Sequence, residues 1–294
     1  MVDVIIDLLL LLSYLLPVIY DGIERKIRAF VHTRIGPSIL QTLYDLLKLM
    51  VKKPVVLHTI PYYIYVMTLS LICLFLSQYM VLNSVFYGDL HYIMLAVVFF
   101  TVAHASTILS PLVLPNPYSQ IGGAREIFIS LVNEPFLLAG FGLLIQGLRD
   151  AFLDIGDNIL IKSIRLALIL SMLALCIYTS SRRTPFDLGE ADPELASGIA
   201  VELSGPILAL THYATLLTRF IGPMLVIGLL ITVFTGGGLM ATGLLMISTL
   251  PAWILYAIPS MLLGRTRIDL AVKSFFKIYL ALFVLIALLA MIGD

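Results

Sequence analysis

Residues 206–234 read PILALTHYATLLTRFIGPMLVIGLLITVF, a run of 29 residues with a single charged side chain, Arg219. The hydrocarbon core of a bilayer is about 30 Å thick, and a helix needs about 20 apolar residues to cross it. An α-helix also satisfies its own backbone polar groups, which a segment surrounded by lipid must do. The stretch therefore predicts a membrane-spanning helix.

The rest of the chain has the same character. It has 294 residues, of which 60% are hydrophobic and 12% charged, with a mean hydropathy of +1.05. A soluble domain carries about 25% charged residues. The sequence predicts an all-α, polytopic membrane protein with one transmembrane domain over 1–294. About eight spans are expected, at 4–20, 60–82, 92–112, 127–148, 159–180, 206–234, 238–263 and 274–292.

The lysines and arginines predict how these spans are oriented, because cytoplasmic loops of membrane proteins are enriched in them. Fourteen of the 18 lie in or beside four segments that fall on one side if the spans alternate: 21–59, 113–126, 181–205 and 264–273. We expect these segments on the inner side of the cell membrane and both termini outside. Loops held by a rigid scaffold often carry function, so a site is expected on the inner face.

A different kind of helix is predicted at 39–51, ILQTLYDLLKLMV. Its apolar residues recur at helical spacing, with Gln41, Asp45 and Lys48 on the opposite side. This pattern is typical of an amphipathic helix that lies along the membrane interface. Basic amphipathic helices either lie on membranes or bind partners, and the sequence leaves both interpretations open.

Four polar residues form a stripe on the predicted fourth span: Glu126, Ser130, Asn133 and Glu134. At 100° per residue they fall within about 100° of arc. Since a charge facing lipid costs about 3 kcal/mol, the stripe is expected to face protein or water. Glu126 also suits a plain helix N-terminus. Glu134, about 12 Å further along the helix, suits that alternative less.

The segment 181–205, SRRTPFDLGEADPELASGIAVELSG, is rich in carboxylates. Carboxylates that are crowded and buried hold protons more readily, and can pass them on near neutral pH. A solvated acidic loop is the alternative from spacing alone. The acids are Asp187, Glu190, Asp192, Glu194 and Glu202.

Polar residues also occur inside the predicted spans. Arg219 follows Pro206 by 13 residues, which places it about 20 Å from the inner edge. An arginine at that depth is a functional candidate. We expect His104 to make a helix–helix hydrogen bond, whereas the role of His212 stays open.

Four motifs, in order along the chain and each in an inner segment, carry a resemblance to a known family. They resemble the H subunit of bacterial complex I, also called NADH dehydrogenase subunit 1, and the membrane anchor of energy-converting nickel–iron hydrogenases. The spacing from Gly36-Pro37 to Gln41 and Asp45 favours the hydrogenase branch. At Thr179-Ser180-Ser181 the chain departs from the family, which often has a glutamate there. The motifs are Glu24-Arg25-Lys26 with Arg34-x-Gly36-Pro37, Ile121–Glu126 with Glu134-Pro135, Arg183-x-Pro185-Phe186-Asp187 through Gly205, and Arg265-x-Arg267-x-Asp269.

The resemblance implies a subunit that joins a cytoplasmic redox arm to an ion-translocating membrane arm. The implied partners are hydrogenase-like small and large subunits, antiporter-like membrane subunits and the lipid bilayer. The net charge is zero, so the composition suggests no nucleic-acid partner. Iron–sulfur clusters and a nickel–iron site are expected on partner subunits. No cofactor or metal is expected on this chain, because its two cysteines, Cys73 and Cys176, lack the spacing of a cluster or zinc motif. The alternatives are a quinone- or methanophenazine-site subunit of a complex I type enzyme, and a free-standing ion transporter.

Two sets of residues follow from this interpretation. The expected ion-coupling set is Glu126, Glu134, Asp187, Glu190, Asp192, Glu194, Glu202 and Arg219. Arginines pair firmly with carboxylates, so those of the inner segments are the expected anchors of the redox arm. They are Arg25, Arg34, Arg125 and Arg183.

Overall fold

A computed structural model describes residues 2–54, 60–153, 159–187, 189, 198 and 202–293, and of 2–6, 150–153, 159, 268, 292 and 293 it describes the backbone alone. All regular secondary structure in this part of the chain is helical. The α-helices are α1 (Val2–Val31), α2 (Gln41–Val51), α3 (Ile60–Tyr87), α4 (Leu90–Leu109), α5 (Pro117–Leu153), α6 (Ile159–Ser180), α8 (Gly205–Thr235), α9 (Leu239–Leu262) and α10 (Ile268–Gly293), with a 3-10 turn, η1 (Ser110–Val113), after α4.

Seven of these helices are long and apolar enough to cross a membrane: α3, α4 with η1, α5, α6, α8, α9 and α10. They coincide with seven of the eight expected spans. The remaining expected span, 4–20, lies within α1, which is helical but is not among the seven. The short helix expected at 39–51 is present as α2.

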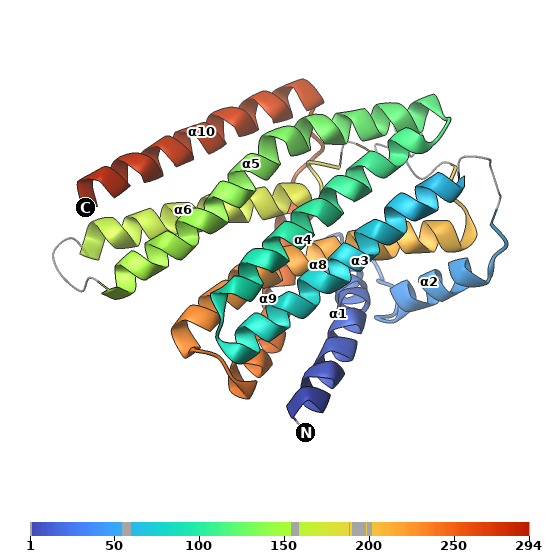
Figure 1. Ribbon diagram of the computed structural model, residues 1–294. Coiled ribbons are helices and arrows are strands. Elements are labelled where there is room, and N and C mark those ends of the chain that lie inside the picture. Colours follow the sequence, from blue (N-terminus) through green and yellow to red (C-terminus); the bar gives the residue numbers. More distant parts are fainter. Residues whose placement is uncertain are drawn as a thin grey trace.

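Helix α8 is the centre of the bundle. It is the most buried of the seven candidate spans and packs against α1, α2, α3, α4, α6 and α9. Figure 1 shows α10 at the edge of the bundle, where it contacts α5 and α6. Of the seven candidate spans, α10 is the least buried. The rest of the α10 surface is therefore open to lipid or to another subunit.

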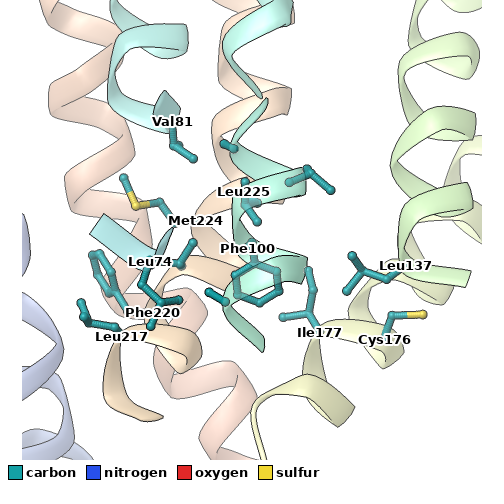
Figure 2. Close-up of a cluster of buried hydrophobic side chains, with 14 of the residues drawn as sticks. Leu74, Val81, Phe100, Leu137, Cys176, Ile177, Leu217, Phe220, Met224 and Leu225 are labelled. Atoms are coloured by element: carbon teal, nitrogen blue, oxygen red, sulfur yellow. The ribbon is translucent and has the colours of Figure 1, made fainter. Parts of the chain in front are cut away.

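The apolar core joins α8 to its neighbours (Figure 2). Leu217, Phe220 and Leu225 of α8 meet Phe100 of α4 and Ile177 of α6, all at most 2% exposed. Burial of such side chains contributes about 1.5–3 kcal/mol each relative to water. Helices inside a bilayer gain less, because lipid tails are themselves apolar, so close packing carries more of the stability.

The chain connections gather at two opposite ends of the bundle. At one end the turn after α8 meets the turn after α3, where Gly238 N donates to Phe86 O at 2.9 Å. At the other end Thr266 N donates to Pro185 O at 3.2 Å. The second end contains the described parts of all four expected inner segments, so the structure groups them as the alternation of spans requires.

Two helices extend at least ten residues beyond their expected spans. Helix α1 continues through the first eleven residues of segment 21–59, and α5 begins at Pro117, inside segment 113–126. In α1 the extension carries ion pairs at i,i+4 spacing, with Arg25 Nε 2.8 Å from Asp21 and Arg28 Nη2 3.0 Å from Glu24. Such pairs stabilise a helix beyond the end of its apolar run. The motif Glu24-Arg25-Lys26 is therefore helical and not a loop.

Helix α2 is held against α1 and α8 by a close backbone approach and a polar cluster. A methyl group on Gly22 would lie 1.8 Å from Ile39 O, so only glycine fits there. Asp45 of α2 accepts from Gln41 at 2.9 Å and from Arg25 of α1 at 2.9 Å. The spacing of Gln41 and Asp45 thus places both side chains at the α1 contact.

Candidate functional site

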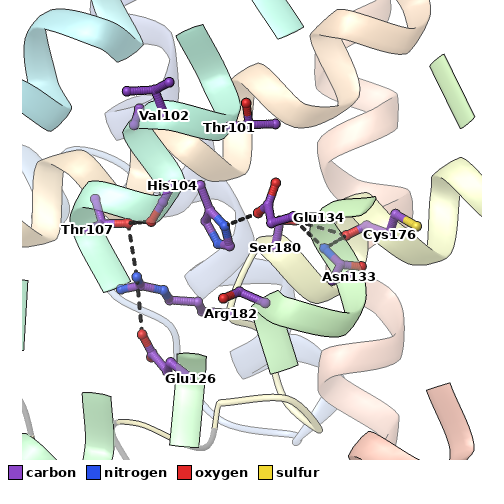
Figure 3. Close-up of polar contacts among 12 residues, drawn as sticks. Thr101, Val102, His104, Thr107, Glu126, Asn133, Glu134, Cys176, Ser180 and Arg182 are labelled. Atoms are coloured by element: carbon purple, nitrogen blue, oxygen red, sulfur yellow. Dashed lines mark hydrogen bonds and ion pairs between the residues drawn. The ribbon is translucent and has the colours of Figure 1, made fainter. Parts of the chain in front are cut away.

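The polar stripe of α5 faces protein, and its deepest acid pairs with a histidine of α4 (Figure 3). Glu134 Oε1 lies 2.5 Å from His104 Nδ1. The His104 side chain is 4% exposed and that of Glu134 is 20% exposed. His104 stacks on Phe100 one turn earlier, at 6.3 Å between ring centroids. The expected helix–helix hydrogen bond of His104 is present, and its partner is an ionisable group.

Glu126, at the inner end of the same stripe, pairs with Arg182 of the segment after α6. Arg182 Nη2 lies 3.1 Å from Glu126 Oε2 and donates to Thr107 Oγ1 at 3.0 Å. Thr107 in turn donates to His104 O at 2.7 Å. Arg182 has a left-handed backbone, with φ +48°, a conformation that costs about 1 kcal/mol outside glycine. Its contacts to both α4 and α5 offset that cost.

Asn133, another member of the stripe, ties α5 to α6 and α10. Its side-chain nitrogen donates to Cys176 O at 3.1 Å and to Ser180 Oγ at 2.8 Å. Its oxygen accepts from Tyr279 OH at 3.0 Å. These polar contacts are all made in the interior, so Asn133 fixes the rotation of α5 that brings the two acids to their partners.

Three cavities follow one another through the inner half of the bundle. The first, here called the α5 cavity, has about 20 Å³ and is lined by His104, Glu126, Ser130, Asn133 and Arg182 among others. The second, the α8 cavity, has about 30 Å³ and shares Arg182 and Ser180 with it. The third, the α1–α2 cavity, has about 350 Å³ and shares His212 and Thr215 with the second. Neighbouring cavities thus share polar lining residues, Ser180 and Arg182 between the first two and His212 and Thr215 between the second and third.

A buried ion pair lies beside this series. Arg183 Nη1 is 2.6 Å from Glu24 Oε2, and both side chains are at most 4% exposed. The Arg183 guanidinium also lies over the ring of Trp253, 4.9 Å from its centroid. Burial lowers the pKa of Arg183, and the Glu24 carboxylate acts in the opposite direction. The pair joins α1, α9 and the segment after α6 in one contact.

Arg219 makes no ion pair among the described residues and instead binds backbone. It donates from Nε to Ser181 O at 3.0 Å and from Nη2 to Arg182 O at 3.3 Å. These carbonyls follow the end of α6, where helix carbonyls lack partners and a cation is favourable. Arg219 also lines the α1–α2 cavity together with Asp21 and Glu24. The segment after α6 therefore reaches the middle of α8, rather than staying at the inner surface.

The other expected coupling residues are distributed differently. Asp187 lies toward the surface, 3.1 Å from Arg265. Glu202 is half-buried, and its Oε2 has no hydrogen-bond partner among the described residues. Glu190, Asp192 and Glu194 lie outside the described residues. The structure thus brings Glu126 and Glu134 to one stripe of α5 with partners inside the bundle, whereas Asp187 pairs with Arg265 nearer the surface.

The expected docking arginines differ in how exposed their side chains are. Arg34 is exposed, and Arg125 is half-buried. Arg25 is half-exposed and pairs with Asp21 and Asp45 inside the chain. Arg183 is buried against Glu24, so its guanidinium faces the interior and not a partner.

Sequence reasoning did not include His104, Arg182 or Glu24 in either set of site residues, yet the structure places them at the centre of the polar network. His104 could have been considered from sequence, since it is a polar residue inside a predicted span and Glu134 lies in the next span. The spacing of the two residues does not predict that their side chains are in contact. Among the described residues no three His, Cys, Asp or Glu side chains come together as a metal site.

A polytopic helical membrane protein with buried ion pairs is thus defined by fold and site, and comparison with known proteins gives its family. The model of the NADH dehydrogenase family matches residues 4–291. Formate hydrogenlyase subunit 4 of Escherichia coli is 27% identical over 268 residues, covering 85% of this chain and 86% of that protein. The H subunit of the NADH-quinone oxidoreductase of Geobacillus kaustophilus is 29% identical over 221 residues, covering 67% and 64%.

A solved structure has the same fold. It is that of the membrane-bound sulfane sulfur reductase, an archaeal respiratory membrane complex, with a TM-score of 0.75, 20% identity and 98% coverage of both chains. The chain belongs to the NADH dehydrogenase family. The relatives named here are subunits of oxidoreductase complexes of the hydrogenase and NADH-quinone types.

Proposed function

We propose that this chain is the membrane-anchor subunit of a ferredoxin-linked respiratory complex, either a membrane-bound hydrogenase or a sulfur-reducing relative. It joins a cytoplasmic redox arm to an ion-translocating membrane arm and carries buried carboxylates of the coupling path. The observation that carries the proposal is the pair of acids on α5, Glu126 and Glu134, which are held inside the bundle by Arg182 and His104.

Physical reasoning supports a coupling role for these groups. Buried charges cost several kcal/mol each unless they are paired, and replacement of such pairs by apolar residues is often neutral or stabilising. Their presence in a chain with 12% charge is thus poorly explained by stability alone. Interacting acids and bases titrate together, so a small movement of one changes the proton affinity of the others. The three cavities provide the space in which water would carry that coupling.

The arm is proposed to dock on the inner end, over segments 21–59, 113–126 and 181–205. Arg34 is an exposed cation there, and Lys48, Lys52 and Lys53 are nearby in sequence. Arg183 is proposed to act indirectly, because its pairing with Glu24 fixes the segment on which the arm would rest. The exposed apolar residues of α2 include Tyr44, Leu47 and Met50, which suit an interfacial position.

The α1–α2 cavity bears on the alternative, a quinone-site subunit. Its volume of about 350 Å³ is within the range of small-molecule sites. Such sites are mostly apolar, however, whereas this one has three leucines and nine polar or charged residues: Asp21, Glu24, Arg25, Arg28, Thr42, Asp45, His212, Thr215 and Arg219. This lining favours a water-filled, charged space over a site for an apolar ring.

The test is ion uptake into inverted membrane vesicles, driven by reduced ferredoxin, with the content of arm subunits measured in parallel. The Glu134→Gln and Glu202→Gln double variant keeps side-chain shape and removes both charges. We expect uptake to fall at least tenfold while the arm remains bound. Asp7→Asn, which changes an exposed acid of α1, is the matched control and should leave uptake unchanged. Normal uptake in the double variant would mean that these acids are structural.

A further inference from the structure

The contact between His104 and Glu134 leaves one nitrogen of the histidine unexplained. With Nδ1 at 2.5 Å from the carboxylate, that nitrogen carries the proton when Glu134 is ionised. The other ring nitrogen, Nε2, is buried and has no hydrogen-bond partner among the described residues. A buried polar atom without a partner costs about 1–3 kcal/mol. Such an atom therefore calls for a partner that the described residues do not supply.

The α5 cavity is the place for that partner. It is lined by His104, and its volume of about 20 Å³ is sufficient for one water, which needs about 10–15 Å³ on this measure. A buried water also needs two to four polar partners. Ser130, Ser180 and the Glu126–Arg182 pair line the same space. The cavity is thus both large enough and polar enough to hold a water beside the ring.

From these observations we propose that His104 and Glu134 form a proton-loading dyad that exchanges its proton with a water in the α5 cavity. This proposal rests on the proposed function and extends it, because it assigns a histidine, in addition to the acids, as a proton carrier. In the empty state the imidazole is neutral, its Nδ1–H donates to the Glu134 carboxylate, and Nε2 accepts from the water. In the loaded state a proton from the inner aqueous phase, relayed through the water, is on Nε2; the water is left neutral, and the imidazolium faces the carboxylate. The dyad alternates between net charges of −1 and 0, with one proton gained or lost.

Surrounding groups make this exchange responsive to the inner end of the chain. Arg182 lines the same cavity and contacts α4 and α5 through Thr107 and Glu126. Its own backbone carbonyl accepts from Arg219 of α8 at 3.3 Å. A displacement of the segment after α6 would therefore move a positive charge relative to Nε2. Proximity of that charge disfavours the loaded state, and its withdrawal favours it.

The test compares His104→Gln with Glu134→Gln in the whole complex, by the number of ions taken up per electron transferred. Glutamine at 104 keeps a donor toward Glu134 but cannot carry the proton. We expect the ratio to fall at least fivefold in His104→Gln, with arm content and electron transfer within twofold of the parent. A merely structural hydrogen bond would leave the ratio unchanged.

A reversed dyad provides the rescue. The His104→Glu and Glu134→His double variant keeps one imidazole and one carboxylate in contact, and it should recover at least half of the parent's ratio. If Glu134→Gln uncouples the complex while His104→Gln does not, the dyad is overturned and the proposed function stands. If neither variant changes the ratio, the proposed coupling role of Glu134 fails as well, while the anchoring role is tested separately by the content of arm subunits.

A measurement on the unmodified complex covers the case in which neither variant assembles. A high-resolution density map should contain one ordered water within hydrogen-bond distance of His104 Nε2, inside the α5 cavity. An empty cavity, or a protein side chain filling it, would overturn the proposal.

Discussion

Arg183 and Glu24 are 159 residues apart in the chain, yet their side chains meet at 2.6 Å in the interior. Each is nearly completely buried, and each has a second contact, Arg183 with the ring of Trp253 and Glu24 with Arg28. Because these contacts join α1, α9 and the segment after α6, one pair fixes the relative position of elements from both halves of the chain.

Loss of this pair should destabilise the protein strongly. Glu24→Gln leaves the Arg183 charge buried without a counter-charge, which costs about 3–5 kcal/mol. Asp45→Asn is the matched control. The side chains of Asp45 and Arg25 are each 42% exposed, and ion pairs between exposed side chains contribute about 0–1 kcal/mol. Thermal unfolding of the detergent-solubilised protein measures both. Equal unfolding temperatures for the two variants would contradict a structural role for the buried pair.

The first helix should cross the membrane, which would give eight spans and place both termini outside. Single cysteines at Val2 and His32, near the ends of α1, test this after the buried Cys73 and Cys176 have been replaced by serine. A membrane-impermeant maleimide should label position 2 from the outer face and position 32 from the inner face only. Labelling of both positions from the same face would mean that α1 does not cross.

Arg34 should contribute to docking of the redox arm. It is exposed and lies between α1 and α2, in the segment with the largest number of cations. Arg34→Glu reverses the charge, and we expect at least half of the arm subunits to leave washed membranes. Arg267→Glu, which also reverses an exposed arginine at the same end of the bundle, is the control and should retain the arm. Immunoblots of the membrane and soluble fractions measure the outcome, and full retention in Arg34→Glu would count against the docking surface.

The fold was largely predictable from sequence, and the site only in part. The all-α class is confirmed for the described residues, and seven of the expected spans are present there as helices long and apolar enough to cross a membrane. Runs of apolar residues identify such helices directly from sequence. The family resemblance is confirmed as well. Helix ends were less accurate where ion pairs such as Arg25 with Asp21 extend α1 past its apolar run.

Side-chain pairing across the bundle could not be read from the chain. Periodicity places Glu126 and Glu134 on one face of α5, but it does not say that Arg182 and His104 are opposite them. Arg183 illustrates the same limit, since an arginine in a polar loop predicts a surface cation, and its burial depends on Glu24 of a distant helix.

Arg219 belongs to the expected ion-coupling set, and its hydrogen bonds to two backbone carbonyls allow its charge to be tested separately from its hydrogen bonding. Arg219→Gln keeps a donor for the carbonyls of Ser181 and Arg182 but removes the charge. If the charge matters for coupling, ion uptake should fall at least threefold while the unfolding temperature stays within a few degrees. Arg219→Met, which removes donor and charge together, should also lower stability by about 1–3 kcal/mol, through the unpaired carbonyls. Unchanged uptake in Arg219→Gln would restrict this residue to holding the end of α6.

Purification of the native complex through a tag on this chain tests the central claim most directly. If the chain is a membrane anchor, hydrogenase-like small and large subunits and antiporter-like membrane subunits should co-purify in fixed ratio, identified by mass, with iron on the soluble subunits. Nickel in the same preparation would indicate a hydrogenase, and its absence a sulfur-reducing relative or a complex I type enzyme. Recovery of the chain alone, with ion transport activity after reconstitution of that single protein, would contradict the account.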